Sequence, residues 1–110
     1  MSALPDTVWK MPTARQLAEA MTAINTAQMM QHFLRDVMTE KEIIEISSRL
    51  EAAKMLQQGK RYTEIIDRTK LSSRTVARIS DWMRNGQGGY AAALQIINEH
   101  HRHISPARAE

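Results

Sequence analysis

The chain has 110 residues, the size of one ordinary domain, and its 43% of hydrophobic and 25% of charged residues are typical of a globular protein. It contains no cysteine, which excludes disulfides, thiol catalysis and cysteine-ligated metal centres, and no apolar run of about 18 residues that would span a membrane. The net charge is +3, and no secretory signal is visible, so we expect a cytoplasmic protein. The shortage of aromatic residues, prolines and glycines favours an all-α fold.

The N-terminal part of the chain is predicted to hold an arm followed by helical structure. Residues 1–12 carry no periodic pattern and predict a flexible N-terminal arm. Thr13 and Gln16 then match a capping box and predict a helix start. The helical pattern continues to about residue 34, either as one long helix or as two short helices with a break.

A second capping box, Thr39 with Glu42, opens an amphipathic helix that we expect to end at Gly59. Spacings of three and four residues predict that one side of this helix packs into the core. The residues on that side are Ile43, Ile46, Leu50, Ala53 and Leu56.

Residues 59–86 hold two shorter helical patterns around a tight connection. The first covers residues 62–70, with Ile65 and Ile66 inward. Ser72 is expected to cap the second. Its predicted core residues are Val76, Ile79 and Met83. This arrangement is typical of a helix-turn-helix, here at about residues 62–84.

The glycines around residues 85–89 predict a loop, and residues 90–100 predict a last helix before a tail at 101–110. The residues of this helix that we expect to be buried are Ala91, Ala93, Leu94 and Ile97. The pattern as a whole predicts one helical domain over residues 13–100.

Positive charge is concentrated in residues 59–86. The segment carries seven lysines and arginines against three acidic residues, a net +4, so the rest of the chain carries −1. A local excess of this kind fits a nucleic-acid face, and equally a solvated helical face.

The N-terminal residues of the second helix of a DNA-reading helix-turn-helix reach base edges in the major groove. Here these residues are Ser72, Ser73, Arg74 and Thr75. Arg74 can make a bidentate pair with guanine, and the hydroxyls can serve bases or phosphates. The other DNA-binding candidates are Lys60, Arg61, Thr63, Lys70 and Arg78.

Among these candidates, Lys60, Arg61 and Lys70 are placed for phosphates rather than for bases. Lys70 also stands where the connection of a helix-turn-helix commonly has glycine. A left-handed conformation there costs a residue with a side chain roughly 1 kcal/mol.

Five stretches resemble the Trp repressor superfamily in the same order, and in particular its Trp-repressor-like (YerC/YecD-type) branch. They are FLRDVMT at 33–39, SRLEAAKMLQQGK at 48–60, YTEI at 62–65, SSRTVARIS at 72–80 and GQGGYAAAL at 86–94. The resemblance implies an intertwined homodimer in which helices of both chains build one core. It also implies a bacterial DNA-binding transcription regulator, more specifically a repressor, that reads a palindromic operator in double-stranded DNA.

The founding member of that family is a repressor that needs L-tryptophan. The resemblance implies that Thr39, Arg49 and Arg78 correspond to its tryptophan-binding residues. Arg78 would pair with the ligand carboxylate and Arg49 would cover the indole. Ile79 stands where tryptophan-binding members have glycine, and its bulk would fill the site. We therefore expect no cofactor and keep a tryptophan-responsive repressor as an alternative.

No nucleophile elbow or phosphate loop accompanies the serines, histidines and aspartates, so we expect no enzyme activity. The histidines of residues 100–103 lack a cysteine or acidic partner at helical spacing, so we expect no metal site. Two further alternatives stay open: a dimeric protein-interaction module without DNA binding, and RNA binding through the same basic face.

Overall fold

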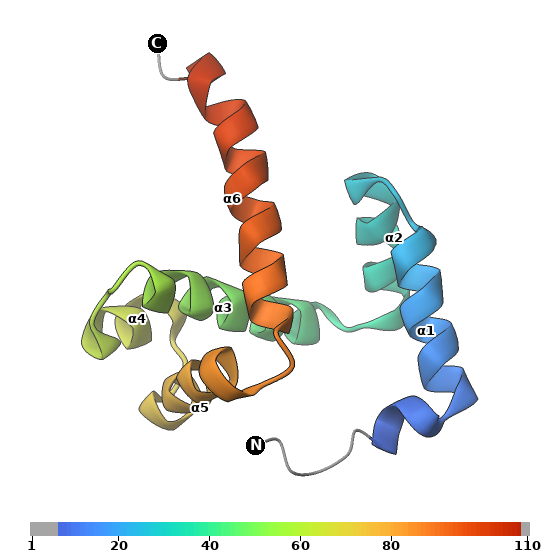
Figure 1. Cartoon of the computed structure of the whole chain (residues 1–110), viewed down its shortest axis with the longest axis horizontal. Helices are drawn as coiled ribbons and strands as arrows, with labels where there is room; N and C mark the ends of the chain where they lie inside the picture. The colour runs from blue at the N-terminus through green and yellow to red at the C-terminus, as the bar shows by residue number, and fades with distance from the viewer. Residues whose placement is uncertain (1–6, 109–110) are drawn as a thin grey trace. The chain divides into compact units, whose positions relative to one another are not determined.

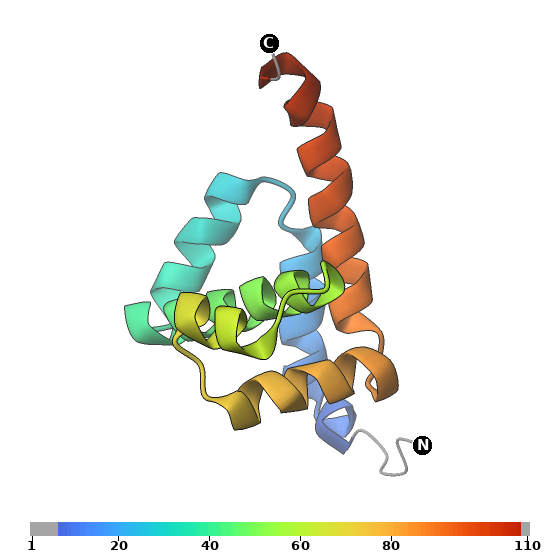
Figure 2. The same ribbon diagram turned by 90° about the vertical axis from the view of Figure 1, so that its left-hand side faces the viewer.

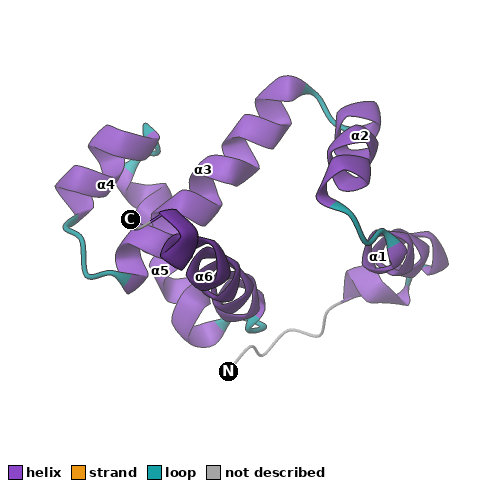
Figure 3. Cartoon of the chain, turned by 90° about the horizontal axis from the view of Figure 1, so that it is seen from above, coloured by secondary structure: helices purple, strands orange, loops and turns teal. Residues whose placement is uncertain are grey.

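The computed structural model of the chain describes residues 7–108, with side chains described through residue 100. The described residues form helices joined by loops and contain no strand, so the all-α prediction is confirmed (Figure 3). A short 3-10 helix, η1, precedes six α-helices (Figure 1). Their bounds are Thr7–Lys10 for η1, Pro12–Ala23 for α1, Ala27–Val37 for α2, Glu40–Gln57 for α3, Tyr62–Thr69 for α4, Ser73–Asn85 for α5 and Gly89–Arg108 for α6.

The chain divides into an N-terminal unit, Met1–Glu45, and a C-terminal unit, Ile46–Glu110, with the boundary inside α3. The described part of the N-terminal unit contains no buried residue. Its large apolar side chains that are exposed are Val8, Trp9, Met11, Leu17, Met29, Val37 and Ile44. This unit therefore has no core of its own within residues 7–45.

Two short helices, rather than one long helix, follow the arm. α1 ends before Ile24, and Thr26 caps α2 by accepting a hydrogen bond from the Met29 N–H at 3.1 Å. The predicted capping box at Thr13 is wrong. The N-cap of α1 is Met11, without a side-chain bond, and Pro12 takes the first helical position, where its missing N–H is no loss.

The arm itself is only partly within the described residues. Thr7–Lys10 form a 3-10 helix where the sequence predicted no regular structure, and Arg15 donates a hydrogen bond to the Trp9 carbonyl at 2.8 Å. The predicted arm residues 1–6 lie outside the described part of the chain.

The start and end of α3 follow the sequence prediction. The Thr39 N–H donates to Glu42 Oε1 at 2.9 Å, and the Glu42 N–H donates to Thr39 Oγ1 at 3.1 Å, which is a complete capping box. Gly59 adopts a left-handed φ of 80° and reverses the chain after α3. The N–H groups of Gly59 and Lys60 close this turn onto the carbonyls of Leu56 and Met55, both at 3.0 Å.

The core of the structure lies in the C-terminal unit. The largest fully buried side chains there are Ile65, Val76, Ile79 and Leu94. They come from α4, α5 and α6, and three buried residues of α3 complete the cluster: Ala52, Ala53 and Met55. The predicted core positions in the helix-turn-helix are confirmed, with Ile66 and Met83 half-buried against the cluster.

Two predictions of burial fail. Ile46 belongs to the predicted apolar face of α3, but 55% of its surface is exposed. Ala91 is also exposed, whereas Leu94 is buried and Ile97 packs against the core. The buried residues of α3 all lie in its C-terminal half. Ile46 and Ala91 therefore lie outside the core cluster.

α6 is longer than the sequence predicted. It begins at Gly89 and continues to Arg108, beyond the expected end at residue 100 (Figures 1 and 2). Asn98 donates to Gln57 Oε1 at 3.4 Å and so connects α6 with the last residue of α3. Within residues 7–108, no helix is long and apolar enough to cross a membrane.

We expect Ile65→Ala to lower the free energy of unfolding by about 2–5 kcal/mol, because it leaves a cavity in the fully buried cluster. Thr63→Ala, at an exposed position of the same helix, is the control and should change stability little. Urea unfolding at one fixed protein concentration measures both. Equal stability of the two variants would show that α4 is not anchored through Ile65.

Candidate nucleic-acid interface

The two helices of the predicted helix-turn-helix are present as α4 and α5 (Figure 2). Three residues join them: Lys70, Leu71 and Ser72. Ile65 on α4 and Val76 on α5 are both fully buried in the same cluster, so the core holds the two helices together. A connection this short, anchored at both ends, fixes the direction in which α5 starts.

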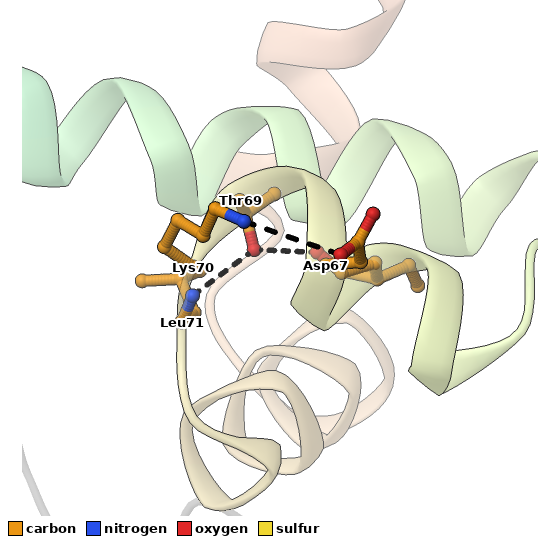
Figure 4. A network of polar contacts seen from close by, with 5 residues as sticks. Asp67, Thr69, Lys70 and Leu71 are labelled. Carbon is orange, nitrogen blue, oxygen red and sulfur yellow. Dashed lines mark hydrogen bonds and ion pairs between the residues drawn. The ribbon is translucent and has the colours of Figure 1, made fainter.

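The turn between the helices is held by Thr69, a residue that the sequence analysis did not single out. Its hydroxyl donates to the Ile65 carbonyl at 2.7 Å and accepts from the Leu71 N–H at 3.3 Å (Figure 4). Thr69 is 8% exposed, so these bonds are shielded from water. A threonine just before a helix end could have signalled this role, because its hydroxyl readily bonds nearby backbone.

Lys70 has a left-handed backbone, with φ 63° and ψ 15°. It is the one residue other than glycine with positive φ in residues 7–108, and this conformation is what the sequence suggested for the turn. Its N–H donates to the Ile66 carbonyl at 2.8 Å and ends α4.

The Lys70 ammonium lies on the surface beside the turn. It is 4.0 Å from Asp67 Oδ1, and both side chains are at least 80% exposed (Figure 4). An exposed pair at this distance is weak and does not hold the ammonium in place. Lys70 can therefore exchange Asp67 for another anion.

The first turn of α5 is capped by Ser72, as predicted. Its Oγ accepts from the Thr75 N–H at 3.1 Å and donates to Thr75 Oγ1 at 3.0 Å. Ser73 and Arg74 are exposed in the same turn, and the turn contains no acidic residue. No carboxylate in this turn therefore neutralises the positive end of the helix dipole.

The remaining DNA-binding candidates lie at two other places. Lys60, Arg61 and Thr63 are exposed around the start of α4, and Lys60 is 4.0 Å from Glu64. Arg78 is exposed in the second turn of α5. The candidates thus fall at the start of α4, in the turn and along α5.

The outer side of α5 carries a shallow hollow of about 470 Å³. The Arg78 guanidinium lies over the Trp82 ring there, 5.5 Å from its centroid. The residues that line the hollow all belong to α5: Arg74, Ala77, Arg78, Asp81 and Trp82. This pairing was not predicted from the sequence, although an arginine four residues before a tryptophan on a helix is a signal for it.

The residues carried over for a tryptophan site belong to two helices: Thr39 caps α3, Arg49 lies on α3 and Arg78 lies on α5. Thr39 belongs to the N-terminal unit and uses its hydroxyl in the cap of α3. Arg49 is half-buried on α3 and does not line the hollow, whereas Arg78 does. Ile79 is fully buried in the core cluster, so its bulk fills the protein interior. Among the side chains of residues 7–100, no group of three metal-ligating residues occurs, and the side chains of His101 and His103 lie outside the described residues.

Comparison with known proteins identifies the family. The profile of the Trp repressor protein family matches residues 13–98, which run from the first turn of α1 into α6. The chain belongs to the Trp repressor family. The Bacillus subtilis (strain 168) protein YerC, described as uncharacterized, is 30% identical over 84 residues, which is 76% of this chain and 81% of YerC.

Crystal structures of the Trp repressor type share the fold. A TrpR-like protein from Eubacterium eligens has a TM-score of 0.78 at 28% identity, over 84% of this chain and 96% of that one. A candidate Trp repressor from Staphylococcus aureus has a TM-score of 0.76 at 26% identity, over 86% of this chain and 96% of that one. The family relation implied by the sequence stretches is therefore confirmed, and it indicates a DNA-binding regulator.

We expect Lys70→Gly to raise the free energy of unfolding by about 1 kcal/mol, because glycine adopts the left-handed conformation without the steric cost of a side chain. Lys70→Ala is the matched control, since it removes the same charge but keeps the β-carbon. Thermal or denaturant unfolding compares the two. Equal stability of the glycine and alanine variants would show that the turn carries no such strain.

Proposed function

We propose that this Trp repressor family chain is a sequence-specific DNA-binding transcription regulator that acts as a repressor. In this proposal α5 enters the major groove with its first turn leading. The observation that carries it is the composition of that turn: a capped helix start, an exposed arginine and no acidic residue. Family membership supports the same general function.

Arg74 is the residue that we assign to base reading. It is exposed, lies in the first turn of α5, and makes no hydrogen bond or ion pair within the described part of the chain. A guanidinium free of internal partners can direct two N–H groups at guanine O6 and N7. The hydroxyls of Ser73 and Thr75 can bind bases or phosphate. Ser72 caps the helix by accepting a hydrogen bond from the Thr75 N–H.

The basic residues outside this turn are assigned to the phosphate backbone. Lys70 is held at the turn by its left-handed backbone while its ammonium stays exposed. Lys60 and Arg61, with the Thr63 hydroxyl, lie at the start of α4, the helix that rests on the backbone in this motif. Contacts of this kind set the register on DNA and carry no sequence information themselves.

The proposal includes an intertwined homodimer. The N-terminal unit supports it, because residues 7–45 expose many apolar side chains and bury none. A second copy can cover these side chains, and two copies would present two reading helices to a two-fold operator. Half-sites about one helical turn apart, roughly 34 Å, are expected for such a dimer. Occupation of an operator near a promoter would then block transcription.

The test of the function is selection of bound sequences from a random duplex pool, followed by affinity measurements on the enriched site. We expect an enriched palindrome and a steep fall of affinity with salt. A flat selection would overturn the proposal. Preference for RNA over duplex DNA at matched salt would favour the RNA-binding alternative.

On the selected site, we expect Arg74→Ala to weaken binding by about 1–3 kcal/mol for each half-site and to relax the preference at one base pair. Arg84→Ala is the control, because Arg84 lies on the same helix but donates to Ser80 at 2.8 Å in its last turn. Fluorescence anisotropy with labelled duplex measures both. A loss of affinity that is equal for the two variants would mean that charge alone, without base reading, drives binding.

The dimer is tested by Leu17→Glu. Leu17 is 49% exposed on α1, and a charge there would be buried in the proposed dimer, so we expect monomers at micromolar concentration and loss of operator binding. Gln16→Glu, a charge at the neighbouring exposed position, is the control and should remain dimeric. Sedimentation equilibrium gives the mass. A native chain that sediments as a monomer while it binds a palindrome would contradict the dimer alone.

A further inference from the structure

We propose that Trp82 is a positioning residue that holds the Arg78 guanidinium for the nucleic-acid backbone. The inference rests on the proposed DNA-binding function and adds a residue to it. Trp82 is 44% exposed near the end of α5, so part of its ring surface is open to contact with another group.

The contact between the two side chains is defined by geometry. The Arg78 Cζ atom lies 5.5 Å from the centre of the Trp82 ring, within the range of a cation–π interaction. The two residues are four apart on one helix, so the backbone of α5 sets their separation. Tryptophan is the aromatic residue that attracts a guanidinium most strongly.

Groups that could compete for Arg78 are already engaged elsewhere. Asp81, three residues further on α5, accepts a hydrogen bond from Asn85 Nδ2 at 2.9 Å. No ion pair joins Asp81 to Arg78 among the described residues. The Arg78 cation therefore lies over the Trp82 ring, while Asp81, which lines the same hollow, is hydrogen-bonded to Asn85.

The contact with the ring leaves the hydrogen-bond donors of Arg78 available. Its guanidinium has five N–H groups, and among the described residues its side chain makes no hydrogen bond or ion pair. Held in this way, Arg78 loses less side-chain freedom when it binds an anion than an unrestrained arginine would. Trp82 thereby prepares the cation for its contact without touching the anion itself.

The position of the pair fits the backbone of the duplex rather than the bases. Arg74 and Arg78 are four residues apart, and both line the hollow on the outer side of α5. Since the first turn leads into the groove, Arg78 follows one turn behind Arg74. A phosphate at the rim of the groove is the partner whose chemistry suits this second, stacked arginine.

The experiment is a double-mutant cycle on the selected operator with Trp82→Ala, Arg78→Ala and the double variant. We expect Trp82→Ala to weaken binding roughly ten-fold for the dimer, and to have no further effect once Arg78 is alanine. The salt slope should be shallower in Arg78→Ala and in the double variant by the same amount. Trp82→Phe should recover most of the affinity, because phenylalanine keeps an aromatic face.

Trp82→Leu keeps an apolar side chain without the aromatic face and separates stacking from packing. Thermal unfolding of each variant checks the fold, and the fluorescence of Trp82 in a Trp9→Phe background should change when duplex is added. If leucine binds as well as tryptophan, or if Trp82→Ala weakens binding equally in the Arg78→Ala background, the positioning role is overturned while the DNA-binding function stands. If the native chain binds no duplex, both proposals fall.

Discussion

Burial of Val76 and Ile79 is the interaction on which the candidate DNA-binding face of α5 depends. Both side chains are fully buried with Ile65 of α4 and Leu94 of α6, so α5 is anchored on one side by two neighbouring helices. Branching at the β-carbon makes both residues stiff, which limits rotation of α5 about its own axis. The other side of α5 therefore faces outward, and its residues Arg74, Ala77, Arg78, Asp81 and Trp82 line the hollow.

Short-range features of the fold could be predicted from the sequence because each depends on a few neighbouring residues. The Thr39 and Glu42 box, the Gly59 turn, the left-handed Lys70 and the Ser72 cap are all of this kind. The capping box predicted at Thr13 is a local failure, because Pro12 takes the first helical position of α1 and Met11 is its N-cap. The failed predictions of burial involve longer range. Ile46 has the spacing of a core residue, but spacing reports that a face is apolar and does not tell which segment, or which copy of the chain, covers it.

In the candidate site, too, local features were predicted from the sequence and contacts between side chains were not. The charge distribution located the basic segment. The predicted start of the second helix pointed to Arg74, and this residue is exposed in the first turn of α5 as expected. The contact of Trp82 with Arg78 was not predicted from the sequence. Charge counting assigns every arginine the same role, whereas the structure separates them by partner: Arg84 bonds Ser80, Arg78 stacks on Trp82, and Arg74 has neither contact.

The turn at Lys70 shows why a residue unfavourable to folding can be kept in such a protein. A left-handed conformation costs a residue with a side chain about 1 kcal/mol, and the exposed pair with Asp67 returns little of it. A single phosphate contact through an ammonium contributes on a similar scale and is made twice in a symmetric dimer. Under the proposed function, the left-handed Lys70 lowers the stability of the fold, and its ammonium raises the affinity for DNA. Lysine at this turn is then better explained by recognition than by stability.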